Sequence, residues 1–181
     1  IDGKKTVEYF RDKFTDDPAT FMLIDKATKN LTETILFNID IEGSVNKNNT
    51  AVLRVFAKMF YNHLGFFGEN LKVARFEYFL NEDGKTEEFR RVFKGKSGKE
   101  WTVARKAFGL QGRYIIPTLM EVFGMDEEAA KAWFRDKEES NFSIAALVED
   151  IKTYIDKKPE NFRLLFMIDE MGQYAGSDTD H

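Results

Sequence analysis

Cysteine is absent from the 181 residues, and histidine occurs only twice. Without thiols the chain can form neither a disulfide framework nor a zinc site with thiolate ligands. The scarcity of histidine leaves carboxylates as the basis of any metal site. A chain without cysteine also fits a reducing compartment, and we therefore expect a cytoplasmic protein.

The sequence also lacks an apolar run long enough to cross a membrane, and its start does not have the pattern of a signal peptide. We therefore expect no membrane partner. Charge of one sign is not in large excess, because 27 basic and 31 acidic residues leave a net charge of -4. That balance argues against strong electrostatic binding of nucleic acid by the chain as a whole, although it leaves room for a local basic patch. The absence of an initiator methionine suggests a fragment or a processed chain.

Aromatic residues, in contrast, are abundant: 18 phenylalanines lie in a chain that is 43% hydrophobic. A chain of this length can bury the core of one domain, or of one domain with a small lobe. Two short segments have the composition of strands, residues 34–41 and 164–168. Helical spacing and breaker residues predict helices at 4–14, 16–30, 51–64, 71–80, 86–93, 100–108, 113–123, 127–134 and 143–157.

The predicted fold class is α/β and mostly helical, with a small parallel sheet and a large all-helical insertion. Two apolar strands joined by helix usually lie side by side through a right-handed crossover, so we expect residues 35–39 and 164–168 to be adjacent and parallel. An ordinary crossover carries one helix. We therefore assign residues 1–70 and 158–181 to an α/β base and residues 71–157 to an inserted helical lobe.

The second strand carries the main functional signal. Its uninterrupted apolar run predicts a strand buried on both faces, and the acids Asp169 and Glu170 follow directly. Open α/β sheets bind ligands at the carboxyl ends of their strands. In P-loop ATPases this pattern is the Walker B strand, whose Asp helps to hold Mg²⁺ and whose Glu polarises the attacking water. The other interpretation is an ordinary acidic strand end at the protein surface.

A phosphate-binding Walker A loop should accompany such a strand, and the sequence has none. In the glycine-lysine segment 95–100, Phe93 stands where the first glycine belongs and Glu100 stands where Ser or Thr must meet the metal. The segment 3–6 has Lys5 at the hydroxyl position. Both segments are predicted to be turns.

Other candidate residues have structural explanations as well as functional ones. We expect His63 to be a hydrogen-bonded histidine at a helix end, and Trp101 and Trp133 to belong to the core. The densest basic run could be a solvated helix face or a weak contact with nucleic-acid phosphates; it consists of Arg90, Arg91, Lys94, Lys96 and Lys99, joined by Arg105 and Lys106.

A family resemblance adds to this interpretation. The chain resembles the large P-loop ATPase (BrxC type) of bacterial BREX phage-defence systems over essentially its whole length. The matching segments are GKKTVEYF (3–10), ILFNID (35–40), AVLRVF (51–56), VFGMDEEAAKAWF (122–134) and FMIDEMGQY (166–174). The resemblance implies an internal fragment of a larger cytoplasmic protein, with its Walker A loop upstream and the fragment ending just after Walker B.

The resemblance implies ATP hydrolysis by the full-length protein in bacteriophage defence, with Mg-ATP as cofactor and none in this fragment alone. It assigns Glu170 as the catalytic carboxylate that polarises the attacking water, Asp169 as the Mg²⁺ ligand and a nucleotide-site residue, and Gln173 as a second nucleotide-site residue. Asn38 and Asp40 would lie near the same edge, although loop hydrogen bonding explains these residues and Gln173 equally. The expected partners are other phage-defence proteins, with self-association and nucleic acid left open. The alternative function is a non-enzymatic helical module that binds protein or nucleic acid.

Overall fold

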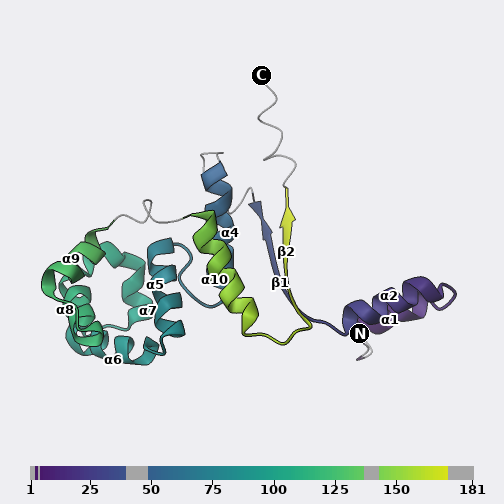
Figure 1. The fold of residues 1–181 in the computed structure, drawn as a ribbon, viewed down its shortest axis with the longest axis horizontal. Coiled ribbons are helices and arrows are strands. Elements are labelled where there is room, and N and C mark those ends of the chain that lie inside the picture. Colours follow the sequence, from purple (N-terminus) through teal and green to yellow (C-terminus); the bar gives the residue numbers. More distant parts are fainter. Residues whose placement is uncertain (1–2, 4, 40–48, 137–142, 171–181) are drawn as a thin grey trace, which may run out of the picture.

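The computed structural model describes residues 3, 5–39, 49–136 and 143–170. Figure 1 shows an elongated arrangement along the long axis of the view. A helical hairpin lies at one end, followed by a small sheet, a pair of helices beside it and a group of further helices at the other end. The chain therefore places its sheet between two helical parts of different size.

The sheet consists, among the described residues, of two parallel strands, β1 (Leu31–Asn38) and β2 (Phe162–Asp169). Their register pairs Leu31 with Phe162 and Asn38 with Asp169. The predicted adjacent parallel pair is confirmed. Each strand starts earlier than the sequence predicts, at residue 31 rather than 34 and at residue 162 rather than 164.

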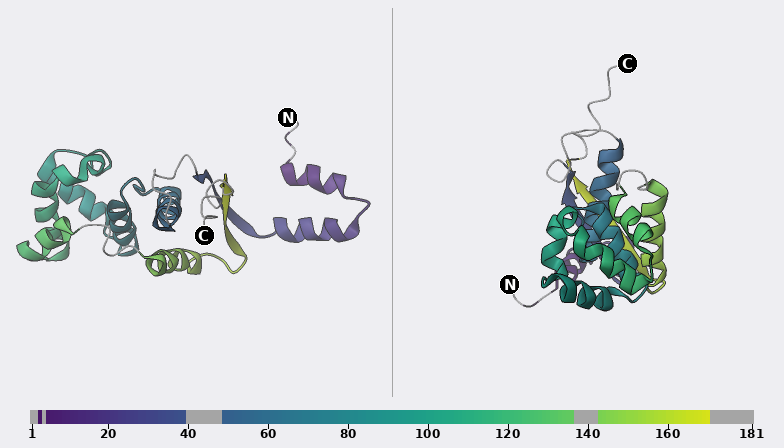
Figure 2. Two further views of the ribbon diagram at one scale, coloured as in Figure 1. Left: turned by 90° about the horizontal axis from the view of Figure 1, so that it is seen from above. Right: turned by 90° about the vertical axis from the view of Figure 1, so that its left-hand side faces the viewer.

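One face of the sheet is covered by α4 (Asn49–His63) and α10 (Ile144–Asp156), which lie beside it in Figures 1 and 2. The inward side chains of both strands pack there. Members of this first core are Ile35, Phe37, Ile39, Val55, Ala57, Phe60, Tyr61, Leu71, Ala74, Tyr78 and Leu147. Partly buried Leu164, Phe166 and Ile168 of β2 complete it. The apolar spacing along α4 thus explains why the helix lies against the sheet.

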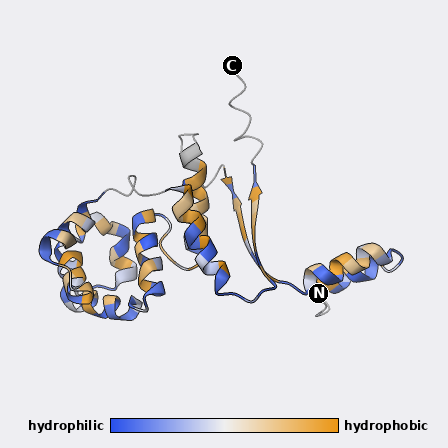
Figure 3. Ribbon diagram, viewed as in Figure 1, coloured by the Kyte–Doolittle hydropathy of each residue, from blue (hydrophilic) through white to orange (hydrophobic). Residues whose placement is uncertain are grey.

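The opposite face of the sheet has no cover among the described residues. Leu36 is 69% exposed there, and Leu165 and Met167 are 45% and 53% exposed. Figure 3 shows how hydrophobic residues run along both strands. The expectation that β2 is buried on both faces is wrong for the described part of the chain, because α4 and α10 cover one side only.

The larger helical part comprises α5 (Leu71–Glu82), α6 (Thr86–Ser97), α7 (Trp101–Ala104), the 3-10 helix η1 (Arg105–Leu110), α8 (Gly112–Phe123) and α9 (Glu127–Arg135). The predicted helix at 100–108 is observed as α7 followed by the 3-10 helix η1, inside which Ala107 has a non-helical backbone (φ -121°, ψ 46°). A second core fills this part: Val73, Phe76, Leu80, Phe89, Phe93, Trp101, Ala104, Phe108, Ile115, Leu119 and Ala130.

Helix α5 contributes to both cores. Its residues Ala74 and Tyr78 belong to the first core, whereas Val73 and Phe76 belong to the second. Helix α10, which the sequence places in the inserted lobe, contributes Leu147 to the first core. The two cores therefore meet along α5 rather than at a linker.

The hairpin consists of α1 (Thr6–Lys13) and α2 (Pro18–Thr28). Asp17 caps α2 by accepting a hydrogen bond from the backbone amide of Thr20, and Pro18 occupies its first turn, as the Asp-Pro pattern predicts. Arg11 joins the two helices by an ion pair with Asp25 at 2.7 Å. No residue of α2 is buried, so the hairpin stands apart from both cores.

No helix within the described ranges combines the length and the apolar character that a membrane span requires.

Candidate nucleotide-binding edge

Asn38 and Asp169 end the two parallel strands and are register partners. Adjacent strands lie about 4.8 Å apart, so the two polar residues share one short stretch of the sheet edge. Because the strands are parallel, this edge is where open α/β sheets bind ligands. The structure thus brings together the two strand ends that the sequence singles out.

Both side chains belong to the uncovered face of the sheet. The burial of β2 alternates along its length, and Asp169 is exposed on the same side as Leu165 and Met167. Asn38 follows Leu36 on the uncovered side of β1 and is half-buried. The carboxylate of Asp169 is therefore accessible from the open face, beside an amide side chain.

Glu170 departs from the strand conformation. Its φ of 62° lies in the left-handed region, and it is the one residue other than glycine with a positive φ in the described part of the chain. Its backbone N–H donates a hydrogen bond to Oδ1 of Asp169, with an N···O distance of 2.9 Å. Left-handed conformations cost L-residues free energy and are frequent at functional sites. The chain thus turns sharply between the two acids.

A magnesium ion fits the donors at this edge only if a bound nucleotide supplies further ligands. Asp169 offers a carboxylate and Asn38 an amide oxygen, which are the ligand types that Mg²⁺ prefers. The described residues contain no group of three or more His, Cys, Asp or Glu side chains placed to hold a metal. Mg²⁺ in nucleotide sites is usually held by one or two carboxylates together with phosphates and waters, so the remaining ligands would come from the nucleotide. Gln173 and Asp40 lie outside the described residues.

The glycine-lysine segment 95–100 is a turn only in part, because residues 95–97 belong to α6, which continues to Ser97 rather than ending at 93 as predicted. Gly98 ends α6 as a left-handed cap with φ 69°, and its N–H bonds to the carbonyl of Lys94. Gly3 also has a positive φ of 66°. Gly98 does not belong to a strand-loop-helix unit of the phosphate-binding kind, because it follows a helix. Lys4, next to Gly3, lies outside the described residues.

A second cluster of ionisable residues lies near the amino-terminal half of β1. The Glu33 carboxylate accepts hydrogen bonds from the Tyr154 hydroxyl at 2.6 Å and from Lys158 at 2.9 Å, and His63 Nε2 lies 2.8 Å from its Oε2. The bond from Tyr154, followed by those from His63 and Lys158, lowers the pKa of Glu33 to about 2. His63 is thus a hydrogen-bonded histidine at the end of α4, as predicted. The cluster joins β1 to α4 and α10.

Two tyrosines link α4 and α5 to α10 in the same way. Tyr61 donates a 2.6 Å hydrogen bond to the Asp150 carboxylate, and Tyr78 donates one of 3.0 Å to the Asp150 carbonyl. Burial raises the pKa of Tyr61, with a further contribution from Asp150. Burial raises the pKa of Tyr78 to about 12. Both hydroxyls therefore stay protonated as donors, which fits a structural role.

A buried carboxylate lies between the loop before α5 and the helices α7 and η1. Glu77, 5% exposed, accepts hydrogen bonds from the backbone of Phe67 at 2.8 Å, from the Trp101 indole at 2.6 Å and from Arg105 at 2.7 Å. The prediction that Trp101 belongs to the core is confirmed, and Trp133 packs against the same core. Sequence reasoning missed Glu33 and Glu77, since an isolated glutamate in a helix or strand looks like a surface residue.

Comparisons with known proteins add no identification: no family model matches the chain, and no solved structure matches it.

Proposed function

We propose that this chain supplies the magnesium-binding edge of an ATP-hydrolysing site, with β2 in the role of a Walker B strand. The observation that carries the proposal is the pairing of Asn38 with Asp169 at the carboxyl ends of two parallel strands. Ligand sites of open α/β sheets lie at such ends. The left-handed turn at Glu170 supports it, because a strained backbone next to an exposed acid is typical of functional sites.

The two acids have different roles in this proposal. Asp169 would hold the metal through its carboxylate, whose Oδ1 also accepts the hydrogen bond from the Glu170 backbone N–H. Glu170 orients a water molecule and accepts its proton as the water attacks. Mg²⁺, when bound, neutralises charge on the phosphates. Asn38 contributes its own side-chain amide at the same edge.

The phosphates themselves need a cradle of backbone amides and a lysine. The sequence contains no segment of that pattern, so the cradle must come from outside the 181 residues. The resemblance to the BREX-type ATPase supports such an arrangement, and extends the proposal to a bacterial phage-defence protein that acts with other defence components in the cytoplasm.

The test uses the full-length protein with substitutions at the two acids. Glu170→Gln should reduce ATP turnover by at least about a hundredfold while ATP affinity stays close to that of the unmodified protein, since the amide keeps the shape of the side chain but cannot accept the proton. Asp169→Ala should weaken Mg²⁺-dependent nucleotide binding, since it deletes a metal ligand.

Glu160→Gln is the matched control, because the same chemical change is then made at an exposed acid just before the other end of β2. It should leave turnover unchanged. Near-normal turnover in the Glu170→Gln protein would reject the proposed site and return the acidic pair to an ordinary strand end. If turnover is lost, phage plating efficiency on cells that carry each variant tests the proposed role in defence.

A further inference from the structure

Positive charge is concentrated in one part of the larger helical group. Residues 85–113, here called the basic segment, contain nine lysines and arginines but three acids, whereas the whole chain has a net charge of -4. The segment spans α6, α7 and η1 and reaches the start of α8. A local excess of this size in an acidic chain indicates a surface for an anionic partner.

Some of these cations are held by carboxylates and others are not. Five have partners: Arg105 with Glu77, Lys96 with Glu121, Lys85 with Asp83, Arg90 with Glu87 and Lys94 with Glu100. Arg113 lies over the ring of Tyr114. Arg91, Lys99 and Lys106 are exposed and have no carboxylate partner in the ranges that the structure describes.

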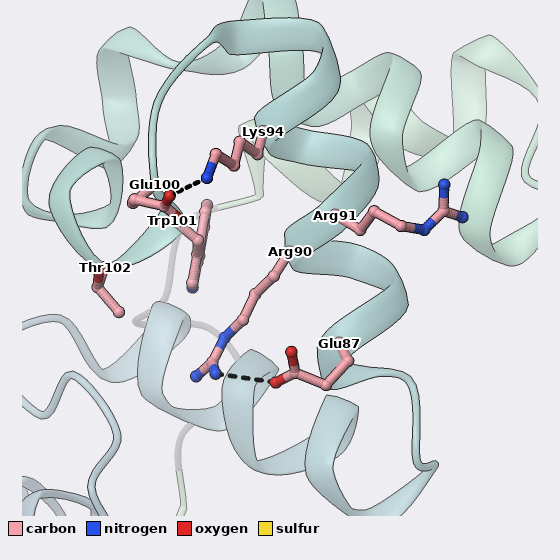
Figure 4. A pocket seen from close by; sticks show the side chains of 7 residues that line it. All are labelled: Glu87, Arg90, Arg91, Lys94, Glu100, Trp101 and Thr102. Atoms are coloured by element: carbon pink, nitrogen blue, oxygen red, sulfur yellow. Dashed lines mark hydrogen bonds and ion pairs between the residues drawn. The ribbon is translucent and has the colours of Figure 1, made fainter.

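A groove of about 390 Å³ opens between α6 and α7 within the basic segment. Figure 4 shows Arg90 and Lys94 reaching from α6 toward Trp101, with Glu87 and Glu100 as their ion-pair partners. Arg91 also borders the groove, but its side chain extends away from both ion pairs. The Thr102 side chain on α7 contributes a hydroxyl to the other wall.

We propose that the basic segment binds the phosphate backbone of a nucleic acid. The unpaired cations Arg91, Lys99 and Lys106 supply the attraction, because neutralising phosphates releases the counterions that surround them. The pairs of Arg90 and Lys94 are exposed, so exchanging a carboxylate for a phosphate at either residue costs little. Trp101 is 2% exposed and cannot stack on a base. Binding is therefore through the backbone and independent of base sequence.

This proposal concerns a different part of the chain from the nucleotide edge and does not depend on it. Fluorescence anisotropy with labelled DNA of about 20 base pairs, long enough for several phosphate contacts, tests it directly on the 181-residue chain. We expect binding that weakens steeply with salt. Arg91→Ala and Lys106→Ala should each lower the slope of log affinity against log salt by about 1. Reversing the charge of Arg91, Lys99 and Lys106 together should weaken binding at least about tenfold.

Lys152→Glu is the control, since it reverses an exposed charge on α10, outside the basic segment. Equal losses in this control and in the Arg91 and Lys106 variants would overturn the proposal, as would no measurable binding at low salt. A second arm replaces DNA with vesicles that contain phosphatidylserine. Vesicle binding as strong as DNA binding, and lost in the same variants, would also overturn it, because the surface would then bind membranes. All substituted residues are exposed, and a circular dichroism melt verifies that each variant folds.

Discussion

The backbone N–H of Glu170 donates a hydrogen bond to Oδ1 of Asp169. The side chain of Asp169 thereby stabilises the turn at Glu170. The bond occupies one carboxylate oxygen of Asp169 and directs the chain into the left-handed conformation at Glu170. A glycine at the second position would adopt that conformation without strain. The presence of glutamate there is consistent with a requirement for its carboxylate.

Glu170→Gly should therefore separate stability from activity. We expect the free energy of unfolding to stay constant or to rise by up to about 1 kcal/mol, because strain relief in the folded state is offset in part by the greater freedom of glycine in the unfolded chain. Urea unfolding of the isolated chain measures this change. Turnover of the full-length Glu170→Gly protein should be lost. A loss of stability above about 1 kcal/mol would indicate that the Glu170 side chain holds the fold instead.

The isolated 181-residue chain should not bind Mg-ATP with micromolar affinity. Its sequence offers carboxylates to a polyanion but contains no Walker A pattern that would cradle the β- and γ-phosphates. Isothermal titration calorimetry with Mg-ATP tests this expectation, and the Asp169→Asn chain provides the comparison. Micromolar binding would contradict this expectation and would mean that the chain contains a phosphate site of another kind.

The cluster around Glu33 should make stability depend on acid pH. Its folded-state pKa of about 2 lies below the value near 4.3 of an unfolded glutamate, so the carboxylate stabilises the fold above about pH 4.3 and this stabilisation is lost as the pH falls toward 2. In Glu33→Gln the loss between these values should be smaller, while the stability at neutral pH falls by about 1–3 kcal/mol. Urea unfolding at several pH values compares the two chains. Parallel pH profiles would contradict the prediction.

Two arginines of the larger helical part, Arg91 on α6 and Arg105 on η1, should respond very differently to substitution by alanine. Arg105→Ala leaves the buried Glu77 carboxylate without its ion-pair partner and should cost about 3–5 kcal/mol of unfolding free energy. Arg91→Ala removes an exposed side chain and should change stability by less than about 0.5 kcal/mol. Thermal and urea unfolding of both variants give the comparison. Similar effects in both would show that the Glu77 carboxylate is not stabilised by Arg105.

The parts of the fold that the sequence predicts well depend on local patterns. The apolar run before Asp169 marks β2, and the Asp17–Pro18 pair marks the start of α2. The parallel pairing of the strands follows from the rule for crossovers. Each of these features involves neighbouring residues or a general constraint on topology.

The polar interactions inside the fold could not be predicted in this way, because their partners lie far apart in the chain. Tyr154 and Glu33 are separated by 121 residues, and Arg105 and Glu77 by 28. The expected burial of β2 on both faces was wrong for a different reason. An apolar strand indicates that its side chains need to be buried, but it does not indicate which segment packs against them. The proposed nucleotide-binding edge could be predicted only in part: the sequence pattern singles out Asp169 and Glu170, but only the structure shows the hydrogen bond and the turn between them.

The position of α5 between the two cores has a consequence for truncation. Removing residues 71–157 as a unit would strip Leu71, Ala74, Tyr78 and Leu147 from the first core and expose the covered face of the sheet. Retaining α5 with the sheet would instead deprive the second core of Val73, Phe76 and Leu80. Since neither core can keep a complete interior without this helix, heat should unfold both of them in a single cooperative transition.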